Sequence, residues 1–129
     1  MTDLLGVHHV ALIVSDIDRS VGFYCDALGF TEVARHYRKE RNSWKVDLRH
    51  ENGMGIELFT FPEAPPRPSR PEARGLRHMA FVVQSVAATA ARLTDLGLHV
   101  EGIRTDPYTG KKFTFLADPD GTPVELYEA

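Results

Sequence analysis

An internal repeat is the feature that most constrains the fold of this 129-residue chain. Residues 6–14 match residues 75–83, which begin 69 positions later, and residues 56–59 match residues 124–127, which begin 68 positions later. The difference of one residue between these spacings is what a single loop deletion would leave. Several similar segments in the same order are improbable by chance, so the sequence indicates a duplicated unit of about 60 residues.

A proline-rich segment, 62–74, separates the two copies of the repeat. Its first ten residues contain five prolines, which excludes a helix or a central strand and indicates an extended, semi-rigid connector. We therefore divide the domain 1–129 into a first module over 5–61, this linker, and a second module over 75–128.

The two modules have the same predicted order of secondary structure. A β-rich run opens each one, and capping-type residues, the segment 15–18 in the first module and Ser85 in the second, precede apolar residues at helical spacing. Turn signals at 52–53 and 118–121 precede the last strand of each module. The predicted helices cover about 19–28 and 86–96, and the later strands cover about 30–37, 44–50, 55–61, 99–105, 112–117 and 123–127. Each module is therefore predicted to be β-α-β-β-β, which is an α+β arrangement made twice.

Side chains alternate across a strand, so each strand can be divided into a helix-facing side and an opposite side. His9 falls on the opposite side of the first strand, and His78 occupies the matching position of the second module. Glu57 and Glu125 fall on the opposite side of the last strands, among apolar neighbours. A half-buried carboxylate within a strand requires a partner, because burying an unpaired charge is costly.

Two imidazoles and two carboxylates are a ligand set suited to a borderline divalent metal such as Zn²⁺, Ni²⁺, Co²⁺, Mn²⁺ or Fe²⁺. The alternative is structural, with each histidine bonded to a backbone carbonyl and each glutamate paired with Arg49, Arg77 or Arg104. For any one of the four residues alone the structural alternative is the commoner outcome. Their presence together at repeat-equivalent positions favours the metal.

Composition and charge exclude several classes of function. The 15 basic residues are scattered among 18 acidic ones, with a net charge of −3, so no basic stripe is present and nucleic acid is not an expected partner. The single cysteine, Cys25, excludes an internal disulfide, fits a reducing, cytoplasmic setting, and is expected to be buried. No signal-peptide pattern or run of about 20 apolar residues is present, so we expect no membrane partner.

Five segments resemble the vicinal oxygen chelate superfamily, namely His9–Asp16, Phe23–Phe30, Ile56–Phe59, Leu76–Phe81 and Asp118–Leu126. This superfamily includes glyoxalase I, fosfomycin-resistance thiol transferases, methylmalonyl-CoA epimerase, extradiol dioxygenases and bleomycin-resistance proteins. The resemblance covers essentially the whole chain. It implies two tandem βαβββ modules that form a cupped mixed sheet.

The resemblance also implies roles for individual residues. His9, Glu57, His78 and Glu125 stand at the four metal positions of the family. His8 precedes the first of these ligands, but strand alternation is expected to point it to the other face. A carboxylate at the second position is typical of bacterial glyoxalase I and is usually absent from fosfomycin transferases and extradiol dioxygenases. The pattern is therefore most similar to the glyoxalase branch.

Membership of that branch implies an enzyme of lactoylglutathione lyase type, in which a small substrate with vicinal oxygens binds the metal and passes through an enediolate. Glu125 would be the base, and Glu57 a ligand or a second proton shuttle. A thiol co-substrate such as glutathione is a further implication. One alternative is an epimerase or other isomerase acting on an acyl thioester. Another is a non-catalytic drug-binding protein, which predicts that no metal is bound.

Three residues are candidates for binding the substrate. Tyr108 and Lys111 lie in a polar loop, 105–112, and are able to meet an anionic group at the mouth of the site, although a solvated hairpin is equally compatible with this loop. Arg49 is the third candidate. We expect a homodimer, because the sheet edges of each module need to be covered. The metal site is then either contained in one chain or shared between two subunits.

Overall fold

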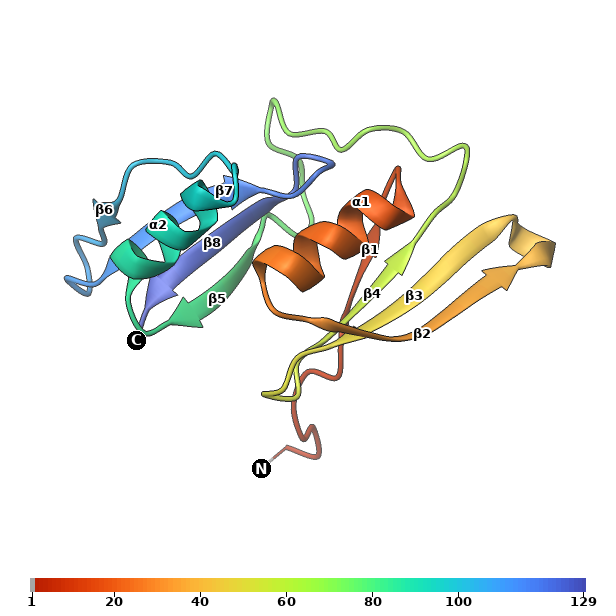
Figure 1. Cartoon of the computed structure of the whole chain (residues 1–129), viewed down its shortest axis with the longest axis horizontal. Coiled ribbons are helices and arrows are strands. Elements are labelled where there is room, and N and C mark those ends of the chain that lie inside the picture. The colour runs from red at the N-terminus through yellow and green to blue at the C-terminus, as the bar shows by residue number, and fades with distance from the viewer. Residues whose placement is uncertain (1) are drawn as a thin grey trace. The chain divides into compact units, whose positions relative to one another are not determined.

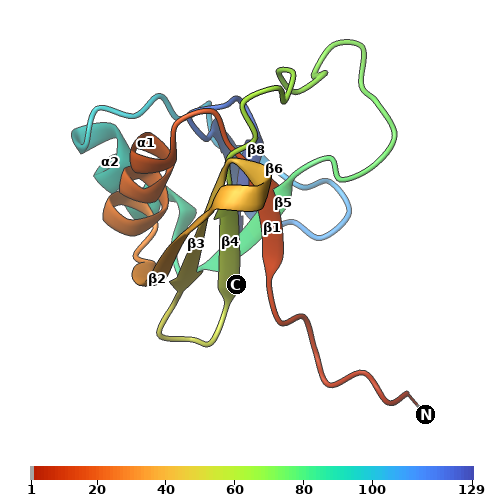
Figure 2. The same cartoon turned by 90° about the vertical axis from the view of Figure 1, so that its right-hand side faces the viewer.

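The computed structural model describes residues 2–129 and contains two compact units, the first ending at Pro65 and the second beginning at Pro66 (Figures 1 and 2). The elements of the first unit are β1 (Val10–Ile13), α1 (Ile17–Gly22), β2 (Thr31–Arg38), β3 (Ser43–Arg49) and β4 (Gly55–Phe59). The elements of the second unit are β5 (Met79–Val83), α2 (Val86–Asp95), β6 (Arg104–Thr105), β7 (Lys112–Ala117) and β8 (Pro123–Glu128). This confirms the predicted α+β class with two tandem βαβββ modules.

The two four-stranded sheets have the same topology, with strand orders β1-β4-β3-β2 and β5-β8-β7-β6. The β1–β4 and β5–β8 pairs are parallel and the remaining pairs are antiparallel, so both sheets are mixed. The parallel pairing places Ala11 beside Glu57 and Ala80 beside Glu125. A methyl group next to each carboxylate leaves space on that side of the sheet.

The core of each unit lies between the helix and one face of its sheet. In the first unit, sheet residues Val46, Leu48, Ile56 and Leu58 are buried together with Tyr24 of the helical segment. The corresponding core of the second unit consists of Leu116, Val124 and Leu126 from the sheet with Val86 and Leu93 from α2. Buried and half-buried residues alternate along β4 and β8, so the glutamates of these strands lie on the face opposite the core, as predicted.

A capping side chain begins each helix. The second helix begins at Val86, as predicted, whereas the first begins at Ile17, two residues before its predicted start. Asp16 accepts hydrogen bonds from the amides of Asp18 and Arg19, each at 3.1 Å. Ser85 accepts one from the amide of Ala88, also at 3.1 Å. Each bond satisfies a backbone donor that has no partner within the first turn of a helix.

The first helical segment differs from the regular helix predicted over 19–28. It is α-helical only to Gly22, and Phe23–Ala27 form a π-helical turn. The wider turn allows two consecutive aromatic residues, Phe23 and Tyr24, to enter the core, where they are 7% and 0% exposed. Cys25 on this turn is only partly buried, so the prediction that it belongs to the core was wrong.

The strand predicted over 99–105 is also shorter than expected, since β6 contains only Arg104 and Thr105. Upstream of β6, the amide of Glu101 donates to the carbonyl of Phe115 at 2.9 Å, and the hydroxyl of Thr114 donates to the carbonyl of Glu101 at 2.7 Å. These bonds satisfy the backbone amide and carbonyl of Glu101 without a paired strand.

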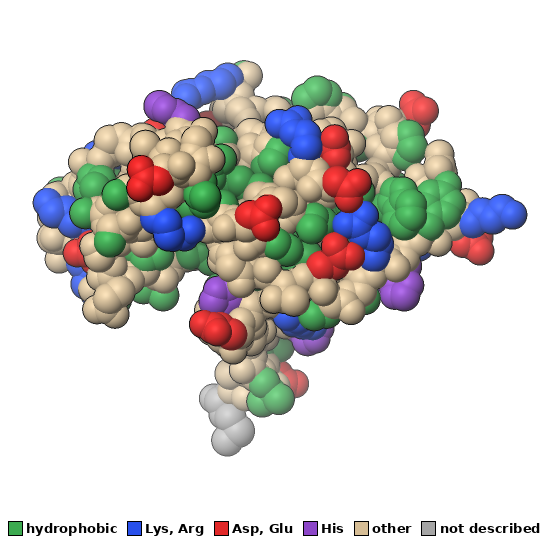
Figure 3. All heavy atoms as spheres, in the orientation of Figure 1, with side chains coloured by type: hydrophobic (Ala, Val, Ile, Leu, Met, Phe, Trp, Pro, Cys, Tyr) green, Lys and Arg blue, Asp and Glu red, His purple; other side chains and the backbone are tan. Residues whose placement is uncertain are grey.

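Within residues 2–129, no helix is long and apolar enough to cross a bilayer. The linker segment 62–74 contains neither helix nor strand. On the face shown in Figure 3, acidic and basic side chains are interspersed. This distribution agrees with the scattered basic residues of the sequence.

Candidate metal-binding site

A histidine and a glutamate meet on the open face of the first sheet. His9 directly precedes β1, and its Nδ1 lies 3.3 Å from Oε2 of Glu57 on β4. The Glu57 side chain is 16% exposed and that of His9 is 37% exposed. The two predicted ligands of the first module are therefore in contact, and the carboxylate is largely shielded from water.

His8 joins this pair rather than pointing away from it. Its Nδ1 lies 2.9 Å from Nδ1 of His9, and ligand atoms of His8, His9 and Glu57 all lie within 4.8 Å of one another. The expectation that His8 lies on the other face was wrong, because β1 begins only at Val10 and strand alternation does not extend back to residue 8.

Arg49 holds His8 in this position. Its guanidinium donates to the His8 carbonyl oxygen at 3.1 Å and lies 3.0 Å from His8 Nε2. Gly55, opposite Arg49 on β4, permits this approach: a Cβ there would lie 2.4 Å from Arg49 Nη1 and 2.7 Å from the His8 carbonyl. The predicted substrate-binding residue Arg49 is thus adjacent to the histidine cluster.

Sequence reasoning missed a second charged pair beside Glu57. Lys45 Nζ lies 2.6 Å from Asp47 Oδ1 and 3.6 Å from Glu57 Oε1. The hydrogen bond to Asp47, followed by the charges of Asp47 and Glu57, raises the pKa of Lys45. Strand alternation along β3 was the signal that could have found these residues, because it places Lys45, Asp47 and Arg49 on one face.

The second unit has a matching pair. His78 Nε2 lies 3.3 Å from Glu125 Oε1, and the side chains are 25% and 15% exposed. The ring of Phe115, which pairs with Glu125 across β7 and β8, meets the His78 ring edge-on at 5.1 Å between centroids. Arg77 Nη1 lies 3.2 Å from His78 Nδ1.

The structural alternative predicted that arginines would neutralise the two glutamates. Within residues 2–129, neither Glu57 nor Glu125 forms an ion pair with Arg49, Arg77 or Arg104. Arg77 pairs with Glu72 instead, and Arg104 pairs with Glu101. Each glutamate therefore has a histidine as a neighbour, which is itself a common metal ligand.

The loop that contains Tyr108 and Lys111 is anchored next to Glu125. Tyr127, two residues after Glu125, donates to Asp106 Oδ2 at 2.8 Å and bonds to the Thr109 hydroxyl. The amide of Tyr108, followed by the hydroxyl of Tyr127, lowers the pKa of Asp106 by bonding to its charged form. The side chain of Tyr108 is 95% exposed, so a role for it or for the exposed Lys111 in substrate binding stays a prediction.

The chemistry of these donors fits a divalent metal. Each unit supplies one imidazole nitrogen and one carboxylate oxygen, and the two carboxylates are largely shielded, whereas His78 is half-buried and His9 is exposed. Nitrogen and oxygen ligands of this kind suit Zn²⁺ and its first-row neighbours. The positive charge of such an ion would also offset the cost of burying the carboxylates.

Comparison with known proteins identifies the family. The profile of the Glyoxalase/Bleomycin resistance protein/Dioxygenase superfamily matches residues 6–126. The chain is 54% identical to the uncharacterized protein YaeR of Escherichia coli over 99% of both chains. It is 28% identical to a probable lactoylglutathione lyase of Synechocystis, over 93% of this chain and 92% of that one. The crystal structure of a glyoxalase family protein from Enterococcus faecalis is 41% identical and superposes with a TM-score of 0.93 over 98% of this chain and 100% of the other. The chain therefore belongs to the Glyoxalase/Bleomycin resistance protein/Dioxygenase superfamily.

Proposed function

We propose that this protein is a metal-dependent enzyme of glyoxalase type, acting on a small substrate with two adjacent oxygens. The observation that carries the proposal is the repeated His–Glu contact, at 3.3 Å in both units. A single pair of this kind is common in a protein surface. Two pairs at equivalent positions of a duplicated fold are what a site with four ligands requires.

His9, Glu57, His78 and Glu125 would hold the metal. When bound, a divalent ion polarises the oxygens of a chelating substrate and makes the neighbouring C–H more acidic. Zinc, nickel, cobalt, manganese and iron all suit two imidazoles and two carboxylates. The four ligands come either from one chain or from two subunits of a homodimer, and both arrangements require both units.

Proton transfer is the task of the protein's own carboxylates. In this proposal Glu125 removes the proton from the hydroxyl-bearing carbon next to the substrate carbonyl, which gives the enediolate, and Glu57 acts as a ligand or returns a proton to the neighbouring carbon. Within residues 2–129, His78 is the one ion-pair partner of Glu125, with its Nε2 lying 3.3 Å from Oε1. The second oxygen of Glu125 is thus left to meet a substrate proton.

The remaining residues in the proposal bind and orient the substrate. Arg49 beside His8, and Tyr108 and Lys111 in the 105–112 loop, would contact its anionic part. A thiol such as glutathione would then be part of the substrate, as in the lactoylglutathione lyase reaction. The 28% identity to a probable lactoylglutathione lyase supports this reaction class.

Metal content is the first test of the proposal. Purified wild-type protein and His78→Ala are dialysed and analysed for metals, with circular dichroism as the control for folding. We expect about one metal per site in the wild type and its loss in the folded variant. A wild type that binds none of the five metals after loading would refute the proposal, and binding of a drug without metal would then be the better account.

A further inference from the structure

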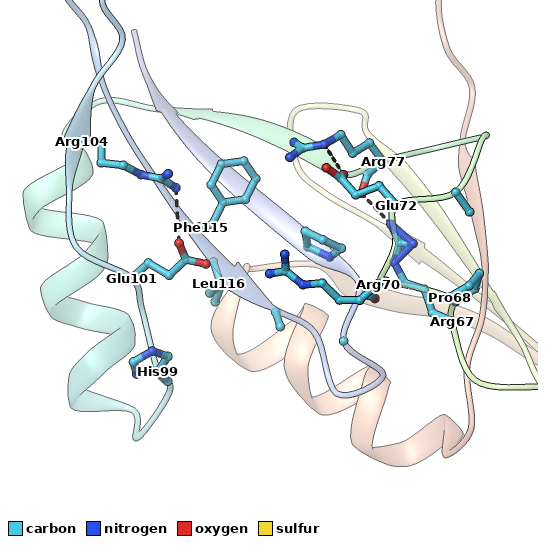
Figure 4. A pocket seen from close by; sticks show the side chains of 15 residues that line it. Arg67, Pro68, Arg70, Glu72, Arg77, His99, Glu101, Arg104, Phe115 and Leu116 are labelled. Atoms are coloured by element: carbon cyan, nitrogen blue, oxygen red, sulfur yellow. Dashed lines mark hydrogen bonds and ion pairs between the residues drawn. The ribbon is translucent and has the colours of Figure 1, made fainter.

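A pocket of about 450 Å³ lies within the second unit (Figure 4). It is lined by residues of the segments 67–77 and 99–104, by the end of β7, and by the first residue of β8, Pro123. Cationic side chains line much of it, namely Arg67, Arg70, Arg77 and Arg104. Two carboxylates, Glu72 and Glu101, also face it, and Phe115 forms part of its apolar wall. The arginines outnumber the carboxylates, so the pocket carries excess positive charge.

Two of the four arginines are neutralised within the pocket. Arg77 Nε lies 2.6 Å from Glu72, and Arg104 Nη2 lies 3.3 Å from Glu101. The Arg104 guanidinium also lies over the Phe115 ring, 5.6 Å from its centroid. The charges of Arg77 and Arg104 are therefore already neutralised by carboxylates of the same chain.

The other two arginines have no acidic partner within residues 2–129. Arg67 donates only to the neutral carbonyls of Arg77, at 2.7 Å, and Leu76, at 3.4 Å, and its Nε is buried without a hydrogen bond. Arg70 forms no hydrogen bond or ion pair with any residue that the structure describes, and its side chain points into the pocket (Figure 4). Together they leave two uncompensated charges.

The linker sequence restrains the backbone of both unpaired arginines. Arg67 stands between Pro66 and Pro68, and Pro71 follows Arg70. Proline fixes φ and restricts the residue before it, so less backbone freedom is lost when a ligand binds. The cost of proline in a sheet or helix is absent here, because the segment contains neither.

The pocket adjoins the candidate metal ligands of the second unit. Phe115 lines the pocket and contacts the His78 ring, and Arg77 reaches to 3.2 Å from His78 Nδ1. A ligand held by Arg67 and Arg70 therefore lies in a pocket that shares Phe115 and Arg77 with the surroundings of His78.

We propose that this pocket binds a phosphate monoester group, through Arg67 and Arg70. A phosphate monoester carries a charge close to −2 at neutral pH and offers three acceptor oxygens, which matches two uncompensated guanidinium groups. The further step, that this phosphate belongs to the substrate, rests on the proposed function. It narrows the small dicarbonyl part of the proposed thiol adduct to phosphorylated compounds with vicinal oxygens.

Calorimetric titration of the metal-free chain, residues 1–129, tests the binding site separately from the metal chemistry. Inorganic phosphate, glycerol 3-phosphate and succinate are titrated at low ionic strength into wild type, Arg70→Gln and Arg41→Gln. Arg41 is the matched control, since it is an exposed arginine in the first unit and its replacement changes the net charge equally. We expect saturable binding of both phosphates, weakened about tenfold or more in Arg70→Gln and nearly unchanged in Arg41→Gln.

Three results would overturn the proposal. One is the absence of saturable phosphate binding, and another is equal weakening in both variants, which would indicate a general charge effect. Succinate binding as tight as glycerol 3-phosphate would assign the pocket to carboxylates instead. Metal content of Arg70→Gln is measured in parallel and is expected to equal that of the wild type. Failure of the phosphate site is thereby distinguished from failure of the metal site.

Discussion

The two units carry the same His–Glu pair in different surroundings. With the 68-residue spacing of the repeat, Lys45, Asp47 and Arg49 of β3 correspond to Phe113, Phe115 and Ala117 of β7. The open face of the first sheet is therefore charged next to its glutamate, whereas the second is aromatic. Asp47 and Phe115 occupy the same place in the ladder, each directly opposite the glutamate of its unit.

This difference separates the roles that the two glutamates can take. Glu57 contacts both His9 and Lys45, so both of its oxygens have partners. Glu125 contacts His78 through one oxygen and lies against an aromatic strand. The duplication has thus kept the pair and changed its neighbours, which favours Glu57 as a ligand and Glu125 as the residue that exchanges protons.

Replacing each glutamate by glutamine tests this separation of roles and has the largest expected effect. We expect Glu125→Gln to lower turnover of a thiol adduct of a small dicarbonyl by about 10²–10⁴-fold, the usual contribution of a general base, with metal still bound. Glu57→Gln is expected to lower metal affinity more than Glu125→Gln does. Turnover and metal content are measured on the same preparations.

Undiminished turnover in Glu125→Gln, with fold and metal retained, would refute its assignment as the base. If both variants lose turnover and metal equally, the two glutamates are equivalent ligands. The comparison between the units would then carry no information about mechanism.

The histidines provide a second test, because the first unit has a spare imidazole and the second does not. In His9→Ala, His8 lies close enough to replace the lost ligand, whereas His78→Ala leaves no other histidine among the neighbours described for Glu125. We expect His78→Ala to lower metal affinity by more than about 100-fold, the upper cost of losing an outer-shell partner, and His9→Ala to lower it less. The prediction concerns the order of the two losses of metal affinity. A larger loss in His9→Ala than in His78→Ala would contradict it. His8→Ala serves as the control for changes in folding.

Gly55 is the third point of difference, since Pro123 stands at the matching position of β8. A methyl group at Gly55 would lie 2.4 Å from Arg49 Nη1 and 2.7 Å from the carbonyl of His8, so one or both must move. We expect Gly55→Ala to lower the free energy of unfolding by about 1–3 kcal/mol, as for other overpacked sites. Urea titration measures this effect. Gly102→Ala is the control, because a Cβ there meets nothing within 4 Å and the variant should be as stable as the wild type.

Much of this fold could be predicted because the repeat supplied each element twice. Alternation identified the face that carries Glu57 and Glu125, and capping-type residues located the start of α2 and, to within two residues, that of α1. These features depend on local spacing, which a sequence displays directly. The π-helical turn at Phe23–Ala27, which buries two adjacent aromatic residues, did not follow from spacing, because the apolar spacing of 21, 24 and 28 is also that of a regular α-helix.

The two His–Glu pairs of the candidate site could be predicted from the sequence, whereas the residues around them could not. The two His–Glu contacts followed from strand faces, whereas the place of His8 depends on where β1 begins, which propensity fixes only to within a few residues. The arginine pocket was not foreseen at all. Its residues are brought together by the path of the linker after Pro66, and no periodic pattern encodes that path.

The smallest expected effect concerns the helices, where Cys25 of the first unit corresponds to Leu93 of the second. Leu93 is fully buried, but the π-helical turn leaves Cys25 partly exposed. Burial raises the pKa of the Cys25 thiol from its usual 9.0, and the negative charges of Asp26 and Glu32 raise it further. The folded chain therefore keeps this thiol protonated at a pH where the unfolded chain forms a thiolate.

Alkylation kinetics measure this difference, because the thiolate is the reactive form. We expect iodoacetamide near pH 9 to react more slowly with the native chain than with the chain unfolded in urea. The part of the free energy of unfolding that depends on the protonated Cys25 thiol is fully present below the pKa of this thiol in the unfolded chain. It is lost as the pH rises through the higher pKa of the thiol in the folded chain. Asp26→Asn removes one of the negative charges and should accelerate alkylation of the native chain. Equal alkylation rates for native and unfolded wild type would contradict the prediction. They would show that the π-helical turn leaves the Cys25 thiol as accessible to solvent as it is in the unfolded chain.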